Sequence, residues 1–149
     1  MMKRFFKMFV ITAAALLLFS ACAKNTSLDS EEMEWFMREN GFTIYDVTEE
    51  MQDTFDGYVE MADVFEKGDE EIYLIQFYDL DYARACYSWM LEDSTVETIA
   101  DGYNYGRAIT TDPENGSAYF SFVNERVIAY FYDGQISQKL LSLINRMGY

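Results

Sequence analysis

Two stretches of the sequence carry the same succession of residue types: "IQFYDLDYARACYSWML" at 75–91 and "AYFYDGQISQKLLSLIN" at 129–145. Each begins with an apolar, aromatic run that ends at an aspartate, Asp79 in the first and Asp133 in the second. Counting from each aspartate, apolar residues recur at +3, +7, +10 and +11, which is the spacing of one helical face. Each stretch therefore predicts a strand, a capping aspartate and an amphipathic helix. The apolar positions are Tyr82, Cys86, Trp89 and Met90 in the first stretch and Ile136, Leu140, Leu143 and Ile144 in the second.

This similarity has two interpretations. Any strand that leads into an amphipathic helix produces such a pattern, so the two stretches need share nothing more. The alternative is a duplicated strand-to-helix unit, which requires both helices to leave their strands in the same geometry. Under either interpretation we expect an α+β fold in which helices pack on one face of an antiparallel sheet, in two layers.

The other elements follow from similar patterns. Residues 30–40 predict a helix that Ser30 caps, that Gly41 ends and whose end is closed by a contact between Phe42 and Met37. The chain end repeats this motif, which places Tyr149 near Ile144. No steady period runs through 94–106, which predicts mostly loop with a short helix at 96–100. Strands are expected at 42–47, 57–66, 71–79, 105–111, 117–124 and 126–132, a helical turn from residue 48, and longer helices at 81–92 and 134–147.

The composition describes an acidic, aromatic-rich chain. Its 149 residues carry a formal net charge of −15, half of them are hydrophobic and 17% are aromatic. So much apolar material supports a real core, and residues 30–149 fit one domain. A surface this acidic is repelled by phosphate backbones, so we expect no nucleic-acid partner.

The first residues differ in character from the rest. Lys3, Arg4 and Lys7 precede an apolar run that is too short to span a membrane comfortably, and small residues follow it. This succession predicts an export signal over residues 1–21, which is removed and takes no part in the fold.

The end of that segment, Leu18-Phe19-Ser20-Ala21-Cys22, resembles the lipobox of bacterial lipoproteins, with Phe19 where leucine is usual. The resemblance implies cleavage before Cys22 and attachment of a diacylglycerol to its sulfur. It also implies a protein held on the extracytoplasmic side of the cell membrane by this lipid, with residues 22–29 as a tether. The alternative, without the resemblance to this family, is that Cys22 is simply a small residue near an ordinary signal cleavage site. The remaining domain resembles small lipoproteins of Gram-positive-type bacteria only in size and layout.

Several classes of chemistry are unsupported by the sequence. The chain has no histidine, which removes histidine-based nucleophilic catalysis and imidazole metal sites. Asp112, Glu114 and Asn115 depart from calcium-loop spacing and suit a hairpin turn better. Asp79 and Asp133 are interpreted as helix caps rather than a catalytic pair, and Cys86 as a small core residue. We therefore predict no catalytic residues, no metal ligands and no cofactor.

Tyrosines supply the candidate binding residues. If Phe120, Phe122, Val127, Ala129 and Phe131 face the helices, the alternation of strands places Tyr119, Ile128, Tyr130 and Tyr132 on the outer face of the sheet. Tyr119, Tyr130 and Tyr132 would then form a recognition surface, although a covered dimer face fits the same pattern.

The sequence thus favours a non-enzymatic binding or interaction module, anchored in the membrane, whose partner is an envelope protein or a small molecule. One alternative is a carboxylate-based hydrolase or a calcium-dependent module, which requires two acids converging in a cleft. A further alternative is an inhibitor or immunity-type protein that binds a basic partner through its acidity.

Overall fold

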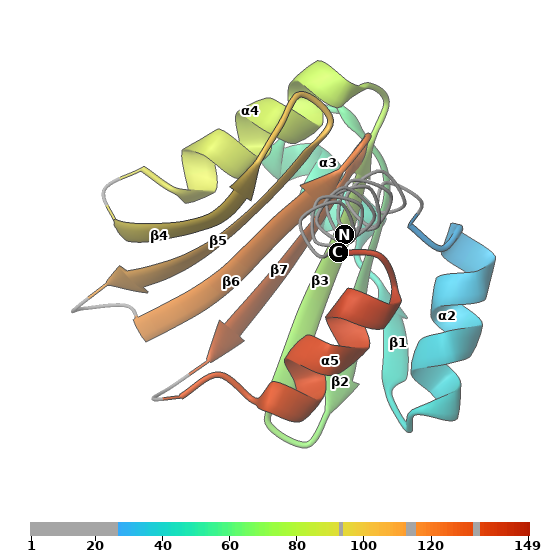
Figure 1. Ribbon diagram of the computed structural model, residues 1–149. Helices are drawn as coiled ribbons and strands as arrows, with labels where there is room; N and C mark the ends of the chain where they lie inside the picture. Colours follow the sequence, from blue (N-terminus) through green and yellow to red (C-terminus); the bar gives the residue numbers. More distant parts are fainter. Residues whose placement is uncertain (1–26, 93, 113–115, 133–134) are drawn as a thin grey trace, which may run out of the picture.

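The computed structural model describes residues 27–92, 94–112, 116–132 and 135–149, and every structural statement below concerns these residues (Figure 1). They form one antiparallel sheet of seven strands in the spatial order β1-β2-β3-β7-β6-β5-β4. The strands are β1 (Thr43–Asp46), β2 (Val59–Lys67), β3 (Glu70–Phe77), β4 (Thr95–Asp101), β5 (Tyr105–Asp112), β6 (Gly116–Val123) and β7 (Arg126–Tyr132). The helices are α2 (Ser30–Glu39), α3 (Thr48–Thr54), α4 (Leu80–Met90) and α5 (Gln138–Arg146).

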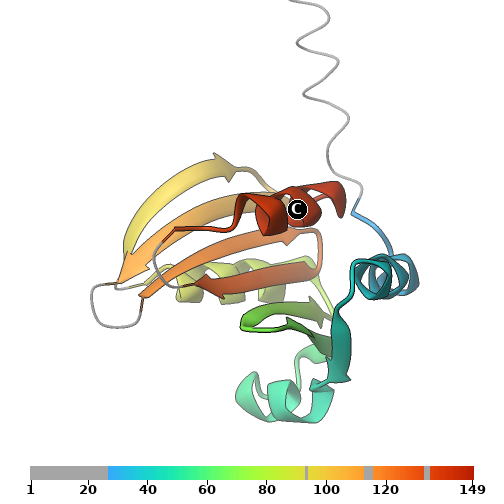
Figure 2. The ribbon, with the colours of Figure 1, turned by 90° about the horizontal axis from the view of Figure 1, so that it is seen from below.

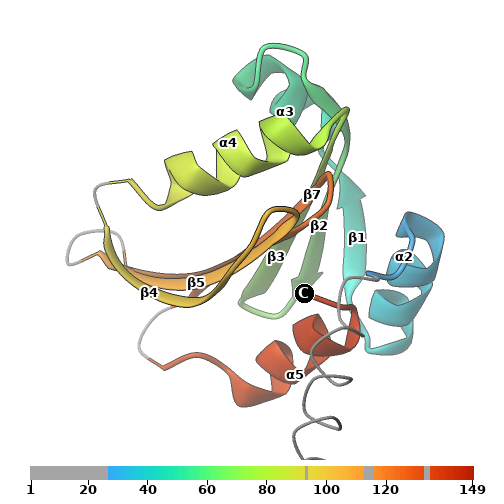
Figure 3. The ribbon, with the colours of Figure 1, turned by 45° about the horizontal axis from the view of Figure 1, so that its top comes forward.

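The predicted α+β class with an antiparallel sheet is confirmed, but the helices lie on both faces of the sheet rather than on one. Figure 3 shows α4 and α5 on opposite sides of it. The physical reason lies in β6 and β7, which carry apolar side chains on both faces of the sheet. Tyr119 opposite Tyr130 needs cover on one side, and Phe120 opposite Ala129 needs it on the other.

Each face has its own core. The α5 face is the side that α2 and α5 cover, and the α4 face is the side that α3 and α4 cover. Figure 2 shows that α2 and α3 both lie at the end of the sheet formed by β1. On the α5 face the buried cluster includes Met33, Met37, Phe65, Leu74, Tyr119, Ile128, Tyr130, Leu140, Leu143, Ile144 and Tyr149. On the α4 face it includes Val59, Ala62, Ile75, Phe77, Ala83, Cys86, Tyr87, Phe120, Phe122, Val127 and Ala129.

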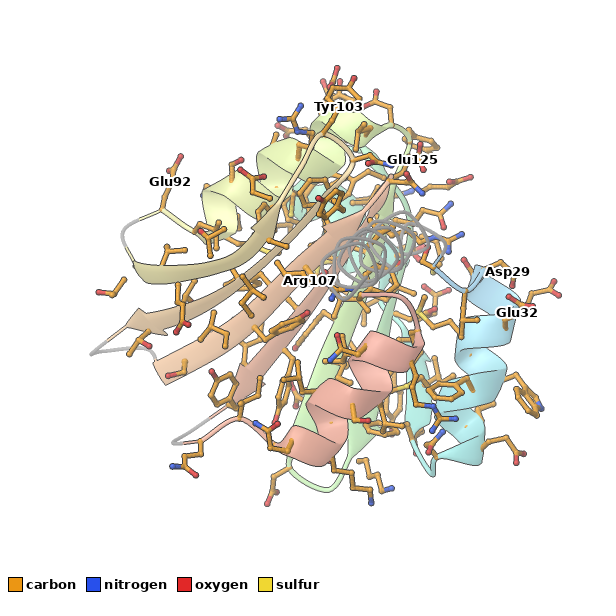
Figure 4. The ribbon with its side chains drawn as sticks, in the orientation of Figure 1. Asp29, Glu32, Glu92, Tyr103, Arg107 and Glu125 are labelled. Atoms are coloured by element: carbon orange, nitrogen blue, oxygen red, sulfur yellow. The ribbon has the colours of Figure 1, made fainter. Side chains whose placement is uncertain are left out.

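The ends of α2 and α5 follow the predicted chemistry with one correction. The cap of α2 is Asp29 rather than Ser30, and it forms a reciprocal capping box with Glu32 (Figure 4). At the other end Gly41 adopts φ +84°, and the Phe42 amide donates to the Met37 carbonyl at 3.1 Å. The chain end repeats this geometry, because the Tyr149 amide donates to the Ile144 carbonyl at 3.2 Å.

The segment predicted as mostly loop with a short helix is the edge strand β4. It pairs with β5 and is almost wholly exposed, with a register irregularity between Thr98 and Ala100. Both sides of the strand meet solvent along most of its length, so no apolar alternation marks it as a strand. Its pairing with β5 sets its conformation.

The hypothesis of a duplicated strand-to-helix unit is wrong. Asp79 caps α4 as predicted, since it accepts from the Tyr82 amide at 3.1 Å. The cap of α5, however, is Ser137, four positions after Asp133, which itself lies outside the described residues. The two helices then pack on opposite faces of the sheet, so the two units do not share one geometry.

Among the described residues, no helix combines the length and the apolar character that crossing a bilayer requires. The predicted export signal, Cys22 and most of the tether lie outside these residues.

Candidate functional site

The three tyrosines predicted to form a recognition surface are covered. Tyr119 is 1% exposed and Tyr130 is 4% exposed, while Tyr132 is partly buried and stacks on Tyr130. They do lie on the side of the sheet opposite Phe120, as the alternation predicts, but helix α5 packs over them. Burial raises the pKa of Tyr119 and Tyr130. The expectation of an open tyrosine face is therefore corrected.

An aromatic cleft lies instead on the α4 face, between α4 and the segment that joins α3 to β2. Its volume is about 460 Å³, within the usual range of small-molecule sites. Residues far apart in the sequence form it, because the β2–β3 hairpin brings the end of α3 beside α4. Its lining consists of Thr54, Phe55, Asp56, Tyr58, Phe77, Tyr82, Ala85, Cys86 and Trp89.

Helix α4 supplies one wall of the cleft. Tyr82, Ala85, Cys86 and Trp89 follow one another at helical spacing, and the cap at Asp79 fixes where this row begins. The spacing of Tyr82, Cys86 and Trp89 predicted that they share one apolar face of the helix, with Cys86 in the core. The buried residues of α4 are in fact Ala83, Cys86 and Tyr87, so the buried face is rotated by about one residue. Trp89 is 60% exposed.

The opposite wall is built by a tight turn at the end of α3. Asp56 and Gly57 both have positive φ, +53° and +80°, a conformation that aspartate tolerates and glycine favours. The Gly57 amide donates to the Gln52 carbonyl at 2.8 Å, and the Gln52 side chain donates to the Val59 carbonyl at 3.1 Å. These bonds hold Asp56 and its two aromatic neighbours in the chain, Phe55 and Tyr58, against α4.

Five aromatic rings line the cleft, and each contacts at least one of the others. Tyr58 stacks on Tyr82 with ring centroids 3.8 Å apart. Phe55 meets Phe77 edge-on at 5.5 Å and Trp89 edge-on at 6.2 Å, so it lies between a buried ring and an exposed one. Because α4 rises 1.5 Å per residue, Tyr82 and Trp89 stand about 10 Å apart along the helix. The cleft thus has an aromatic pair at each end.

The polar groups of the cleft are few and mostly neutral. Burial raises the pKa of the Cys86 thiol to about 12, so this sulfur stays protonated and is a poor nucleophile. A hydrogen bond with Tyr58 raises the pKa of Tyr82. Asp56 is the one carboxylate among the lining residues, and the lining contains no lysine or arginine.

The carboxylate and calcium alternatives each have a structural requirement. A two-carboxylate mechanism needs a second acid, and the cleft lining has only Asp56. No group of three acidic or cysteine side chains suited to a metal ion occurs in the described parts of the chain. Glu114 and Asn115, in the loop weighed as a calcium site, lie outside those parts.

A second unusual carboxyl lies away from the cleft, on the α5 face. Asp63 on β2 is 6% exposed, and its Oδ2 has no hydrogen-bond partner among the described residues. Burial raises its pKa to about 6, and Glu34 and Asp46 add to the effect while Arg38 opposes it. Asp63 is not among the residues that line the aromatic cleft.

Comparison of the chain with protein-family models, with curated proteins and with solved structures gives no match. A proposal about function therefore has to be argued from the geometry of the cleft rather than from similarity to known proteins. One feature of the sequence does point to the cleft in retrospect: α4 carries more apolar residues than one buried face can hold. A helix that is apolar on much of its circumference needs a second partner, and here that partner is the Phe55–Tyr58 segment.

Proposed function

We propose that this protein is a non-enzymatic, extracytoplasmic binding module that uses the aromatic cleft as its ligand site and a lipid on Cys22 as its membrane anchor. The observation that carries the proposal is the cleft of about 460 Å³, walled by five aromatic rings and containing one carboxylate. Ligand sites in proteins are typically concave and apolar with a few polar groups, as this one is.

Binding fits the cleft better than catalysis does. Its thiol is held protonated, it has a single carboxylate, and the sequence has no histidine. General acid–base catalysis near neutral pH needs a group that titrates there or a second carboxylate beside the first. The lining offers neither.

The position of the tether is consistent with presentation of the cleft. The Leu28 amide donates to the Met147 carbonyl at 3.0 Å, and the Arg126 guanidinium donates to the Leu28 carbonyl. Leu28 thus enters the domain on the α5 face, whereas the cleft lies on the α4 face. Five residues lie between Cys22 and Leu28, so the two are six residue steps apart, a reach of at most about 20 Å. An anchored domain would therefore stay near the membrane and present its cleft on the side of the sheet opposite the tether.

The cleft can be tested with a tryptophan reporter. In Trp35→Phe the single remaining tryptophan is Trp89, whose emission responds to occupation of the cleft. We expect at least one member of a panel of ammonium cations, amino acids, monosaccharides and alcohols to shift this emission in a saturable manner. Adding Ala85→Phe, which fills the cleft, should abolish the response. Adding Ser88→Phe, on an exposed position of α4 outside the lining, should preserve it.

Two outcomes contradict the proposal. Either no member of the panel shifts the emission, or the response survives Ala85→Phe as well as it survives Ser88→Phe.

The anchor is tested separately by Cys22→Ser in the full chain expressed in a bacterial host with lipoprotein processing. We expect the parent protein to sediment with membranes and to carry the mass of the attached acyl chains, because two or more chains anchor stably. The variant should be released to the soluble envelope fraction and lack that mass. Sedimentation of the variant at the parent level, with unchanged mass, would refute lipidation at Cys22.

A further inference from the structure

We propose that the ligand recognised by the aromatic cleft carries an alkylated ammonium group, of the quaternary type found in choline. This inference rests on the proposed function, because it assigns a chemical class to the ligand of the same site.

The charges and π faces around the cleft favour a cation. Each aromatic face presents negative electrostatic potential, and five rings converge here. The one charged lining group, Asp56, is also negative, and the chain as a whole has a net charge of −15. An anionic ligand would meet repulsion from all of these sources, whereas a cation is attracted by each.

The protein's own cations occupy other rings. Arg146 lies 4.8 Å from the centroid of Phe36, Arg84 lies 5.2 Å from that of Tyr103, and Lys67 lies 5.4 Å from that of Phe42. Figure 4 shows Tyr103 near the start of α4, and Tyr103 is not among the residues that line the cleft. Within the described parts of the chain, none of these cation–π contacts involves a ring of the cleft, so the exposed ring of Trp89 is left for a cation from outside.

The polarity of the lining selects among cations. A primary ammonium is strongly hydrated and needs several acceptors to replace its water. The cleft offers one carboxylate beside rings and a protonated thiol, which is too few acceptors for that purpose. An alkylated ammonium spreads its charge over methyl groups and needs no hydrogen bonds, so aromatic faces and one nearby carboxylate suffice for it.

The exposed ring of Trp89 is the surface we expect the cation to contact. It is the largest of the five ring systems and 60% of it is exposed, while Phe55 braces it edge-on. Tryptophan also gives the strongest cation–π attraction of the aromatic residues. Asp56 lies beside Phe55 in the chain and supplies the counter-charge.

The test compares choline with 3,3-dimethylbutan-1-ol, which has nearly the same shape but a carbon in place of the charged nitrogen. Both are titrated into the full chain, and binding is measured by calorimetry and by NMR shifts of the Trp89 indole. We expect choline to bind about 5- to 30-fold more tightly than the neutral analogue, the range that cation–π attraction supplies.

Two variants assign the effect to residues. Asp56→Asn keeps a side chain that tolerates positive φ, and should weaken choline binding several-fold while leaving the neutral analogue unchanged. Trp89→Leu should remove most of the preference for choline. Circular dichroism confirms that both variants are folded before their affinities are compared.

The outcomes separate this inference from the proposed function. Equal or tighter binding of the neutral analogue overturns the ammonium assignment and retains the cleft as an apolar ligand site. If choline leaves the indole unchanged while another probe of the panel enters the cleft, the assignment also fails and the binding function stands. If no probe enters the cleft, both fail.

Discussion

The two faces of the sheet are covered by helices of similar pattern that end in opposite roles. Trp89 and Leu143 occupy the same position, ten residues after Asp79 and Asp133, in the two stretches that predicted the fold. Leu143 is 6% exposed within the core of the α5 face, and Trp89 is 60% exposed at the rim of the cleft. The same helical pattern therefore contributes to the core in one place and forms the wall of a cleft in the other.

The difference comes from what lies beside each helix. On the α5 face, α2 contributes Met33 and Met37, which are fully buried in the same cluster as the apolar residues of α5. Beside α4, the segment that follows α3 contributes the rings of Phe55 and Tyr58. These rings meet Trp89 and Tyr82 of α4, and a cleft remains between the two segments. Helical periodicity predicts which residues share a face, and the distant segment decides whether that face is closed.

The largest effect expected from this contrast is in the free energy of unfolding. Leu140→Ala creates a cavity in the α5-face core and should lower it by about 2–5 kcal/mol. Trp89→Ala removes a larger side chain but one mostly in solvent, and should lower it by about 1 kcal/mol or less. Urea unfolding followed by circular dichroism measures both.

The same two variants should rank in the reverse order when their loss of ligand binding is compared. A folded Leu140→Ala protein should retain ligand binding measured by calorimetry, which does not depend on the Trp89 reporter, and Trp89→Ala should lose it. The contrast fails if Trp89→Ala proves as destabilising as Leu140→Ala, because Trp89 would then be a core residue.

Much of the fold is predictable because it is written in local chemistry. The Gly41 and Gly148 helix ends form as expected because their sequences offer a residue that accepts positive φ followed by a large apolar side chain. The hairpin strands β2 and β3 and the strands β5 to β7 are found because their apolar runs are bounded by turn residues. The edge strand β4 is missed because its exposure removes the apolar alternation.

The candidate site is predicted much less well, for a reason in its construction. Phe55 and Trp89 are 34 positions apart, and nothing local to either one signals that their rings meet. Alternation along the strands predicts correctly that Tyr119 and Tyr130 lie on one face. Whether that face is open depends on α5, which is capped by Ser137 and packs on the same side. The face of the sheet on which a helix packs depends on the loop that connects it to its strand. The apolar pattern of the helix does not predict this face.

Burial on the α5 face also changes the pKa of an acidic side chain. This gives a second test of the contrast, with a smaller expected effect. Asp63 lies there directly opposite Asp46 of β1 in the strand register. The pKa values of these two carboxyl groups are shifted in opposite directions. Burial raises the pKa of Asp63 to about 6, whereas a hydrogen bond from Thr48 lowers the pKa of the exposed Asp46.

We expect Asp63→Asn to stabilise the protein at neutral pH and not in acid. Because the folded pKa of Asp63 exceeds its ordinary value of 3.8, its contribution to stability is complete below about pH 4 and is lost as the pH rises through 6. The variant should therefore gain on the order of 2 kcal/mol relative to the parent between pH 3.5 and 7.5. Urea unfolding across that range measures the gain.

Asp46→Asn is the matched control, since it changes the facing residue of the same strand pair. The pKa of Asp46 is lowered in the folded state, so its contribution to stability is present above pH 4 and lost in acid. This variant should consequently lose stability at neutral pH relative to the parent, the opposite sign to Asp63→Asn. If both variants give the same sign, or if the two pH profiles are parallel, Asp63 is solvated and α2 does not close the α5 face over it.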